Sequence, residues 1–168
     1  MYLETAHLII TNFTPDMAQV VHQNSLDEDT RRFLPDEVFE TVEDAAETID
    51  FLMSQYERTD GPLVYPVLLK DKTNIGYVQA VPTEGGVWEI GYHIAKQFTG
   101  KGYATEAVSA FLPVIMKQLG IQRIYGICDA ENIGSCKVLE KCGFGLEYQG
   151  AGLYQGKSTQ IKKYVYGE

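Results

Sequence analysis

Gly100 and Gly102 lie in a short loop between an apolar stretch and an amphipathic one, and this arrangement suits the binding of an anion. From Trp88 to Ala95 most residues are apolar or aromatic, which predicts a buried strand. Beyond the loop, apolar residues recur at the spacing of one helical face, and Gly120 is expected to end that helix. Unpaired N–H groups and the positive end of the helix dipole would then point into the loop. The loop is therefore a candidate phosphate-binding site.

The loop differs from two common nucleotide-binding motifs. A mononucleotide loop requires Ser or Thr after its Gly-Lys pair, whereas here Gly100 and Lys101 are followed by Gly102. A dinucleotide loop requires a third glycine at the position that Thr105 occupies. The pattern Gln-x-x-Gly-x-Gly, from Gln97 to Gly102, instead resembles the loop with which GNAT N-acetyltransferases bind the pyrophosphate of acyl-coenzyme A.

Three further stretches carry the same resemblance. Residues 132–144 look like the second GNAT signature, which begins with Asn132 and ends in Gly-Phe. Residues 89–92, followed by 100–107, are similar to the Rim-type branch, which is named for ribosomal-protein N-terminal acetyltransferases. Residues 3–14 resemble the opening strand of that branch. The match covers essentially the whole chain and implies transfer of an acetyl group from acetyl-CoA to a primary amine.

Patterning along the chain predicts the order β-α-α-β-β-β-α-β-α-β-β in one domain, residues 1–168. We expect Thr14 and Thr41 to begin the first two long helices, and residues 25–40 to hold a short helix and a loop. The resemblance implies an α/β (α+β) GNAT-like fold. Its mixed, mostly antiparallel, seven-stranded sheet has helices on both faces and a splayed strand pair that holds acetyl-CoA. The expected strands cover residues 3–13, 63–69, 75–81, 88–95, 122–128, 144–150 and 159–166.

The resemblance also implies which residues bind acetyl-CoA. The strand before the loop would offer backbone groups to the pantetheine arm, and the loop and first helical turn would hold the phosphates. The residues assigned in this way are Tyr92, Ile94, Ala95, Gln97, Phe98, Thr99, Gly100, Lys101, Gly102, Tyr103, Ala104, Asn132 and Ser135. Independently of the resemblance, Lys96 and Lys101 are either phosphate partners or solvated lysines.

Ser135 is the candidate general acid for the departing thiolate. Many GNAT enzymes use a tyrosine in this helix, but Leu139 stands at that position and has no proton to give. In the Rim-type branch a serine in this helix is proposed for the role, and Ser135 matches it. The alternative is that Ser135 only helps to begin the helix near Asn132. A thiol with a pKa of ~8.5 is a good leaving group, so either role is compatible with turnover.

Glu89 and His93 are the candidate general bases. They lie four residues apart in one strand and therefore on one face, and either could deprotonate an amine through water. Glu89 could equally be a structural hydrogen-bond acceptor. An α-amine with a pKa of ~7.7–8.0 needs less help than a lysine amine at ~10.4. The sequence therefore favours the N-terminal α-amine of a protein or peptide as acceptor.

The net charge of −9 is unevenly distributed. Residues 1–60 hold 14 acidic and 3 basic side chains, whereas residues 61–168 hold 9 and 11. The acidic part is either a solvated face or a means of attracting a cationic amine. The resemblance implies that residues 24–40 contact the acceptor; the alternative is a surface loop without a role. The negative charge argues against a nucleic-acid partner.

Cys128, Cys136 and Cys142 form no Cys-x-x-Cys pair, which favours reduced thiols in the cytoplasm over a metal site. Neither a secretory signal nor an apolar run long enough for a membrane span is apparent. We expect a cytoplasmic acetyl-CoA-dependent N-acetyltransferase that is a monomer or homodimer. The alternatives are an acetyltransferase for small amines (polyamine, aminoglycoside or amino acid), a catalytically silent acetyl-CoA sensor, and a nonspecific phosphate-binding scaffold.

Overall fold

The computed structural model describes residues 1–168, which form one eight-stranded sheet and five α-helices. The strands are β1 (Tyr2–Glu4), β2 (Leu8–Thr11), β3 (Leu63–Leu69), β4 (Asn74–Pro82), β5 (Trp88–Ile94), β6 (Arg123–Asp129), β7 (Gly145–Tyr154) and β8 (Lys157–Gly167). The helices are α1 (Ala18–Asn24), α2 (Glu28–Phe33), α3 (Val42–Ser54), α4 (Tyr103–Leu119) and α5 (Ile133–Lys141).

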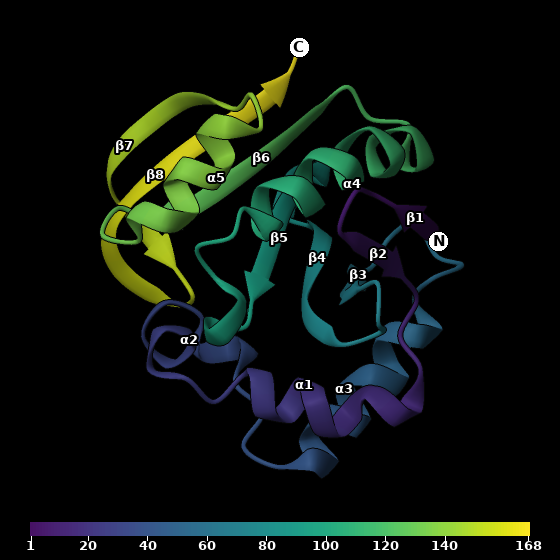
Figure 1. The fold of residues 1–168 in the computed structure, drawn as a ribbon. Coiled ribbons are helices and arrows are strands. Elements are labelled where there is room, and N and C mark those ends of the chain that lie inside the picture. Colours follow the sequence, from purple (N-terminus) through teal and green to yellow (C-terminus); the bar gives the residue numbers. More distant parts are fainter.

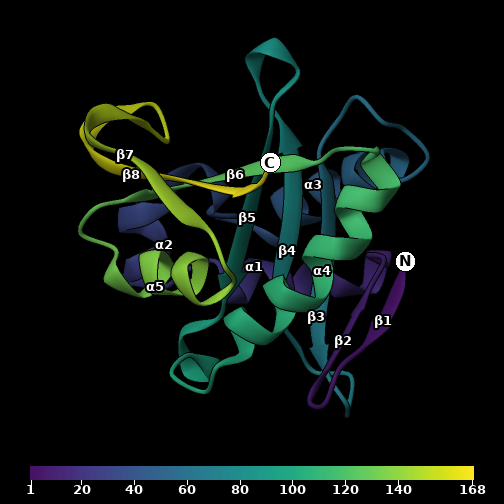
Figure 2. The same cartoon turned by 90° about the horizontal axis from the view of Figure 1, so that it is seen from above.

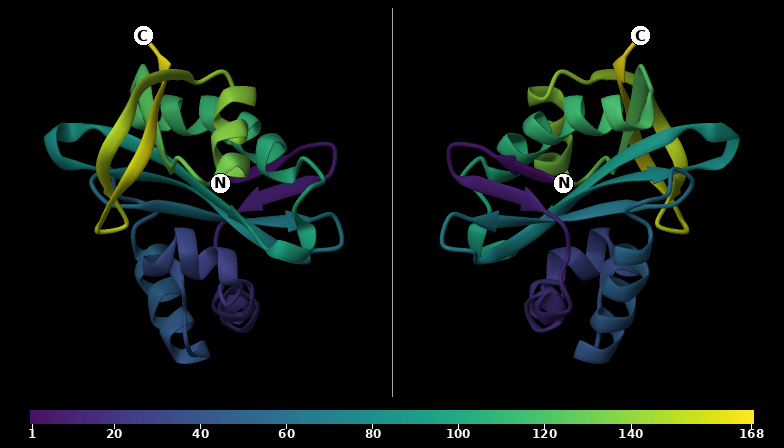
Figure 3. Two further views of the ribbon diagram at one scale, coloured as in Figure 1. Left: turned by 90° about the vertical axis from the view of Figure 1, so that its left-hand side faces the viewer. Right: turned by 90° about the vertical axis from the view of Figure 1, so that its right-hand side faces the viewer.

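The strands follow the order β1-β2-β3-β4-β5-β6-β8-β7 across the sheet, and every neighbouring pair is antiparallel except β5 and β6. Helices α1 and α3 cover one face and α4 and α5 the other, so the molecule has three layers (Figures 1 and 3). Seen from above, the hairpin β7–β8 stands at one end of the sheet and β1 at the other (Figure 2). The predicted mixed, mostly antiparallel α/β sheet with helices on both faces is thus confirmed.

The N-terminal region corrects the expected count of seven strands to eight. Residues 3–13 were expected to form one strand, but a turn at residues 5–7 divides them into β1 and β2, which pair with each other. The turn is held by Glu106 of α4, whose carboxylate accepts hydrogen bonds from Thr5 Oγ1 at 2.5 Å and from the His7 backbone N–H at 2.9 Å. Because Glu106 lies about 100 residues from this turn, the residues near the turn give no indication of the contact.

The helices on the α1 side begin largely as predicted. Thr41 Oγ1 accepts a hydrogen bond from the Asp44 N–H at 3.0 Å, so Thr41 is the N-cap of α3. Thr14, expected to cap the first helix, instead donates to the Asp16 side chain, and a single 3₁₀ turn (Pro15–Met17) precedes α1. The stretch from residue 25 to residue 40 holds the predicted short helix, α2, and a 3₁₀ turn at Pro35–Glu37.

Two apolar clusters fix the layers. One joins the sheet to α4 and α5 and includes Phe111, Ile115 and Leu139; the other joins the sheet to α1 and α3 and includes Ile49. Strand β3 contributes to both, and six successive residues of it are buried because both of its faces are covered. Gly120, with φ 66°, ends α4 as predicted. None of the helices has both the length and the apolar character needed to cross a membrane.

Candidate active site

Strands β5 and β6 pair over only two positions and then separate. Their register joins Glu89 to Tyr125 and Ile90 to Gly126, and no pairing follows towards Ile94. A cavity of about 780 Å³ opens at this divergence and is lined by residues from both sides of the sheet. The expected splayed strand pair is therefore present, and it forms a passage between the two faces.

The backbone of β5 turns free groups towards this gap. On its other edge β5 pairs with β4, and the Ala95 N–H donates to the Ile75 carbonyl at 2.7 Å. Because hydrogen bonding alternates along an antiparallel strand, Tyr92 and Ile94 direct their backbone groups away from β4 and into the gap. An extended ligand arm lying there would find these groups unpaired.

The loop after β5 ends at an uncapped helix. Gly100 and Gly102 have φ 78° and 81°, and no protein atom lies within 4 Å of where a Cβ would stand on either residue. No side chain caps α4, and its first backbone hydrogen bond is donated by the Glu106 N–H to the Gly102 carbonyl. The preceding N–H groups of the helix remain free, so the loop and helix end offer several donors and a positive dipole to an anion.

Ten of the thirteen residues expected to bind acetyl-CoA line the cavity. The other three, Ala95, Gln97 and Lys101, do not. Ala95 is fully buried, and its carbonyl accepts a hydrogen bond from the Phe98 N–H at 2.8 Å, so both of its backbone groups are already occupied. The expectation that Ala95 offers its backbone to the ligand is therefore wrong. Backbone groups alternate between the two edges of a strand, and the N–H of Ala95 points towards β4. Gln97 and Lys101 are exposed on the loop.

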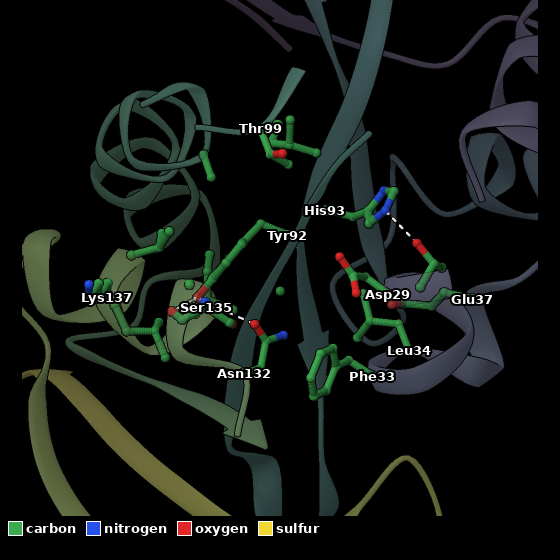
Figure 4. A pocket seen from close by; sticks show the side chains of 18 of the residues that line it. Asp29, Phe33, Leu34, Glu37, Tyr92, His93, Thr99, Asn132, Ser135 and Lys137 are labelled. Atoms are coloured by element: carbon green, nitrogen blue, oxygen red, sulfur yellow. Dashed lines mark hydrogen bonds between the residues drawn. The ribbon is translucent and has the colours of Figure 1, made fainter. Parts of the chain in front are cut away.

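Asn132 begins α5, and Ser135 lies in its first turn beside the gap (Figure 4). Asn132 Oδ1 accepts a hydrogen bond from the Ser135 N–H at 3.3 Å, which confirms the predicted cap. Tyr92 reaches across from β5: its hydroxyl donates to the Ser135 carbonyl at 2.7 Å and lies 3.0 Å from Ser135 Oγ. Because the phenol has one proton, Ser135 Oγ donates the second bond, and its hydroxyl is held between α5 and β5.

The role of the Tyr92 hydroxyl was missed by sequence reasoning, which used only the backbone of that residue. Leu139, where many family members have tyrosine, is fully buried, and a Cβ added to Gly126 of β6 would come within 2.6 Å of it. Leu139 therefore fills core space and offers no proton. A phenol nevertheless reaches α5, supplied by β5, and burial raises its pKa far above the usual range.

His93 lies on the opposite face of β5 from Tyr92, towards α2 (Figure 4). Thr30 Oγ1 donates to Asp27 Oδ1 at 2.6 Å, and a hydroxyl has a single proton. The 2.9 Å contact between Thr30 Oγ1 and His93 Nε2 is therefore assigned as a donation from the ring nitrogen. Burial also lowers the pKa of His93. The ring is neutral near pH 7, and its Nε2 is occupied as a donor.

Glu89 lies on the same face as His93, as predicted, and is half-buried in the cavity wall. Burial raises the pKa of its carboxyl group, and Lys163 of β8 lowers it in part. A carboxylate with this environment accepts a proton more readily than one in water.

The side of the cavity away from α5 is formed by the segment between α1 and α3. Asp27, Asp29, Phe33, Leu34 and Glu37 all line it, which places the expected acceptor-contact region at the cavity. Figure 4 shows four of these side chains on the α2 side of β5, opposite Ser135 and Asn132. Lys96, the basic residue on this side, forms an ion pair with Asp29 at 3.4 Å, so this mouth of the cavity carries net negative charge.

Glu37 was not among the site residues expected from the sequence. It ends the 3₁₀ turn Pro35–Glu37, and its Oε1 accepts a hydrogen bond from Gln79 Nε2 at 3.1 Å. Among 14 acidic residues in the first 60, nothing in the local sequence distinguishes it. The bend imposed by Pro35 and the reach of Gln79 from β4 bring it to the cavity.

The chain resembles known acetyltransferases over most of its length. Residues 7–145 match the family described as acetyltransferase (GNAT) domain. The uncharacterized N-acetyltransferase YnaD of Bacillus subtilis (strain 168) is 31% identical over 149 residues, which are 88% of this chain and 84% of the relative.

Solved structures share the fold. A GNAT-family acetyltransferase from Bacillus anthracis superposes with a TM-score of 0.84 at 26% identity, covering 99% of this chain and 98% of that one. RimL, a ribosomal L7/L12 α-N-protein acetyltransferase in complex with coenzyme A, gives a TM-score of 0.84 at 17% identity, with coverage of 99% and 98%.

Proposed function

This chain belongs to the GNAT acetyltransferase family, and we propose that it transfers an acetyl group from acetyl-CoA to the N-terminal α-amine of a protein or peptide. The observation that carries the proposal is the gap between β5 and β6. It joins an anion-binding helix end on one face to a carboxylate-lined mouth on the other.

The residues of the gap fit acetyl-CoA. The phosphates would lie on the free N–H groups of Gly100, Gly102 and the first turn of α4, where the absence of Cβ atoms leaves room. The pantetheine arm would pair with the unpaired backbone groups of Tyr92 and Ile94, as an added strand does. RimL provides an example of this fold with coenzyme A bound.

The thioester would then lie beside Ser135, whose hydroxyl can stabilise charge on the departing sulfur once it exchanges its hydrogen bond to Tyr92 for one to that sulfur. The amine would approach from the face that carries Glu89 and Glu37. The new C–N bond forms as the C–S bond breaks, the amine gives up a proton, and the thiolate of coenzyme A takes one. Because the thiolate is a tolerable leaving group, the larger demand is for a neutral amine.

The nature of the available bases favours an α-amine over a lysine side chain. The acidic lining attracts a cation, which suits any protonated amine. The available bases are carboxylates whose pKa values burial has raised, and these are better matched to an amine of pKa ~8 than to one of ~10.4. A cytoplasmic location, where the three free cysteines stay reduced, is part of this proposal.

The test is competition between two peptides of the same sequence. One has a free N-terminus and no lysine; the other has a blocked N-terminus and one lysine. Release of the coenzyme A thiol and peptide mass report the reaction, and we expect acetylation mainly of the first peptide. Faster acetylation of the lysine peptide, or of spermidine, would contradict the α-amine assignment, whereas acetyl-CoA binding without turnover of any amine would indicate a sensor.

A further inference from the structure

We propose that Glu37 is the general base that removes the proton from the acceptor ammonium group, and that Gln79 positions it. This inference rests on the proposed function. It assigns the proton acceptor to a residue of the α2–α3 connection rather than to strand β5.

The structure builds a support for the Glu37 carboxylate over the middle of β5. Gln79 faces Gly91 in the β4–β5 ladder, and a Cβ added to Gly91 would come within 2.5 Å of Gln79 Nε2. The glutamine side chain therefore lies across the bare backbone of Gly91 and donates to Glu37 Oε1 at 3.1 Å. Any larger residue at position 91 would displace it.

This support places Glu37 next to the gap. Gly91 directly follows Ile90, the last β5 residue paired with β6, so the carboxylate is held near the point where the strands separate. Gly91, Gln79 and Glu37 all line the cavity that also contains Ser135. An amine that enters from the α2 side would meet the carboxylate before it reached the thioester.

The two candidate bases on β5 are less suited. His93 already donates from Nε2 to Thr30, and burial lowers its pKa. Glu89 is available, but it belongs to the last paired part of β5 and β6, opposite Tyr125, and Lys163 stabilises its charged form. Glu37 has no cationic partner, so its charge is balanced only by neutral donors.

The surroundings of Glu37 make its carboxylate a better proton acceptor than a carboxylate in water. Burial raises the pKa of its carboxyl group, the hydrogen bond from the Gln79 amide lowers it in part, and neighbouring Asp36 raises it. The Tyr77 hydroxyl is buried without a hydrogen-bond partner, and burial and the Glu37 charge raise the pKa of this phenol. Burial, followed by the same charge, raises the pKa of Tyr154 on β7.

In the step that we propose, the R–NH₃⁺ group of the acceptor transfers one proton to Glu37, directly or through one water. The neutral amine then attacks the thioester carbonyl, and as the C–S bond breaks the new amide nitrogen loses its second proton while the sulfur gains one beside Ser135. Glu37 releases its proton to solvent through the open mouth after the acetylated product leaves. Atoms and charge balance without any further reactant.

The test compares Glu37→Gln with the wild-type protein on a peptide with a free N-terminal α-amine, from pH 6 to pH 9. We expect kcat to fall roughly 100-fold at pH 7 with little change in the KM for acetyl-CoA. The deficit should narrow as pH approaches the pKa of the amine itself, because neutral amine then enters without a base. Glu84→Gln, on an exposed turn away from the cavity, is the matched control and should keep the wild-type rate.

Folding is checked separately. Because the pKa of Glu37 is raised in the folded protein, its contribution to stability is greatest at acid pH and is lost as pH rises through the folded pKa. Glu37→Gln should therefore melt no lower than wild type at pH 7. Gln79→Leu should reproduce part of the loss in kcat, since the carboxylate remains but is no longer positioned.

Four outcomes would overturn the assignment. Wild-type kcat in Glu37→Gln at pH 7 would remove the residue from the reaction, and a deficit that is constant with pH would indicate a structural role. The same pH-dependent deficit in Glu89→Gln, and not in Glu37→Gln, would transfer the role to Glu89. If the wild-type protein acetylates no amine at all, the proposed function itself fails, and the base assignment fails with it.

Discussion

Replacing Gly102 with valine tests the anion site, and the chain supplies a close control. Gly102 has φ 81° and Gly85 has φ 80°, and an added Cβ meets no protein atom within 4 Å at either position. Valine in this left-handed conformation costs about 1–2 kcal/mol at both sites. The two variants should therefore lose similar stability, and only their effects on the ligand should differ.

The expected loss in binding follows from the donors that the loop presents. A hydrogen bond to a charged group contributes roughly 1.5–3 kcal/mol, so a side chain that keeps the phosphates from one such donor raises the Kd roughly 10- to 100-fold. A larger loss is expected if several N–H groups are blocked together. Gly85→Val, in the turn between β4 and β5, should bind coenzyme A with the wild-type Kd.

Calorimetric titration of coenzyme A into each variant measures the Kd, and thermal melting verifies that the two substitutions lower the stability of the protein equally. Wild-type affinity in Gly102→Val would refute the phosphate site at α4. Equal weakening in both variants would show that general loss of stability, rather than the loop, controls binding. Titration with adenosine triphosphate tests the phosphate-scaffold alternative, which predicts equal affinity for the two ligands.

Three further predictions concern the α5 side of the gap. Ser135→Ala should lower kcat roughly 10- to 100-fold with little change in the KM for acetyl-CoA, and the rate should recover with a thioester whose leaving thiol is more acidic. If the variant keeps the wild-type kcat under conditions in which the chemical step limits the rate, Ser135 only helps to begin the helix. Asn132→Ala should lower the free energy of unfolding by about 1 kcal/mol through loss of the helix cap, and it should also reduce turnover per folded molecule. If only the melting temperature falls, the role of Asn132 is structural. Tyr92→Phe should lower kcat about 3- to 10-fold, and the double variant with Ser135→Ala should be no slower than Ser135→Ala, because the phenol acts through that hydroxyl. Additive losses in that double variant would give Tyr92 a separate role.

Features that depend on neighbouring residues were predictable from the sequence. The glycine loop before α4, the Thr41 and Asn132 caps and the end of α4 at Gly120 each involve residues within a few positions of one another. The final hairpin shows the limit of this reasoning, because its strands were expected to cover only residues 144–150 and 159–166. Gln155 and Gly156 both have positive φ, so a two-residue turn suffices and both strands extend further than expected.

The remaining parts of the site depend on contacts between distant segments. Glu37 meets Gln79 across 42 positions, and Tyr92 meets Ser135 across 43. In the sequence, Gly91 is only a residue of low strand propensity, and the structure is needed to show that the absence of its side chain makes room for Gln79. Periodicity can place a residue on a face, but it cannot identify the partner that faces it.

The arrangement of β5 gives a physical reason for the uneven charge of the chain. Successive side chains of a strand point to opposite faces, so Tyr92 turns to α5 and the coenzyme side, while His93 turns to α2 and the acidic side. The first 60 residues supply α1, α2 and α3 and have a net charge of −11, and three of their carboxylates line the mouth proposed for the acceptor: Asp27, Asp29 and Glu37. The loop that would bind phosphates belongs to the remainder, with a net charge of +2. One strand thus separates the proposed anion site from the proposed cation site. Because β6 leaves β5 after Ile90, the two proposed sites meet at the gap, and this geometry would restrict the transfer of an acetyl group to that point.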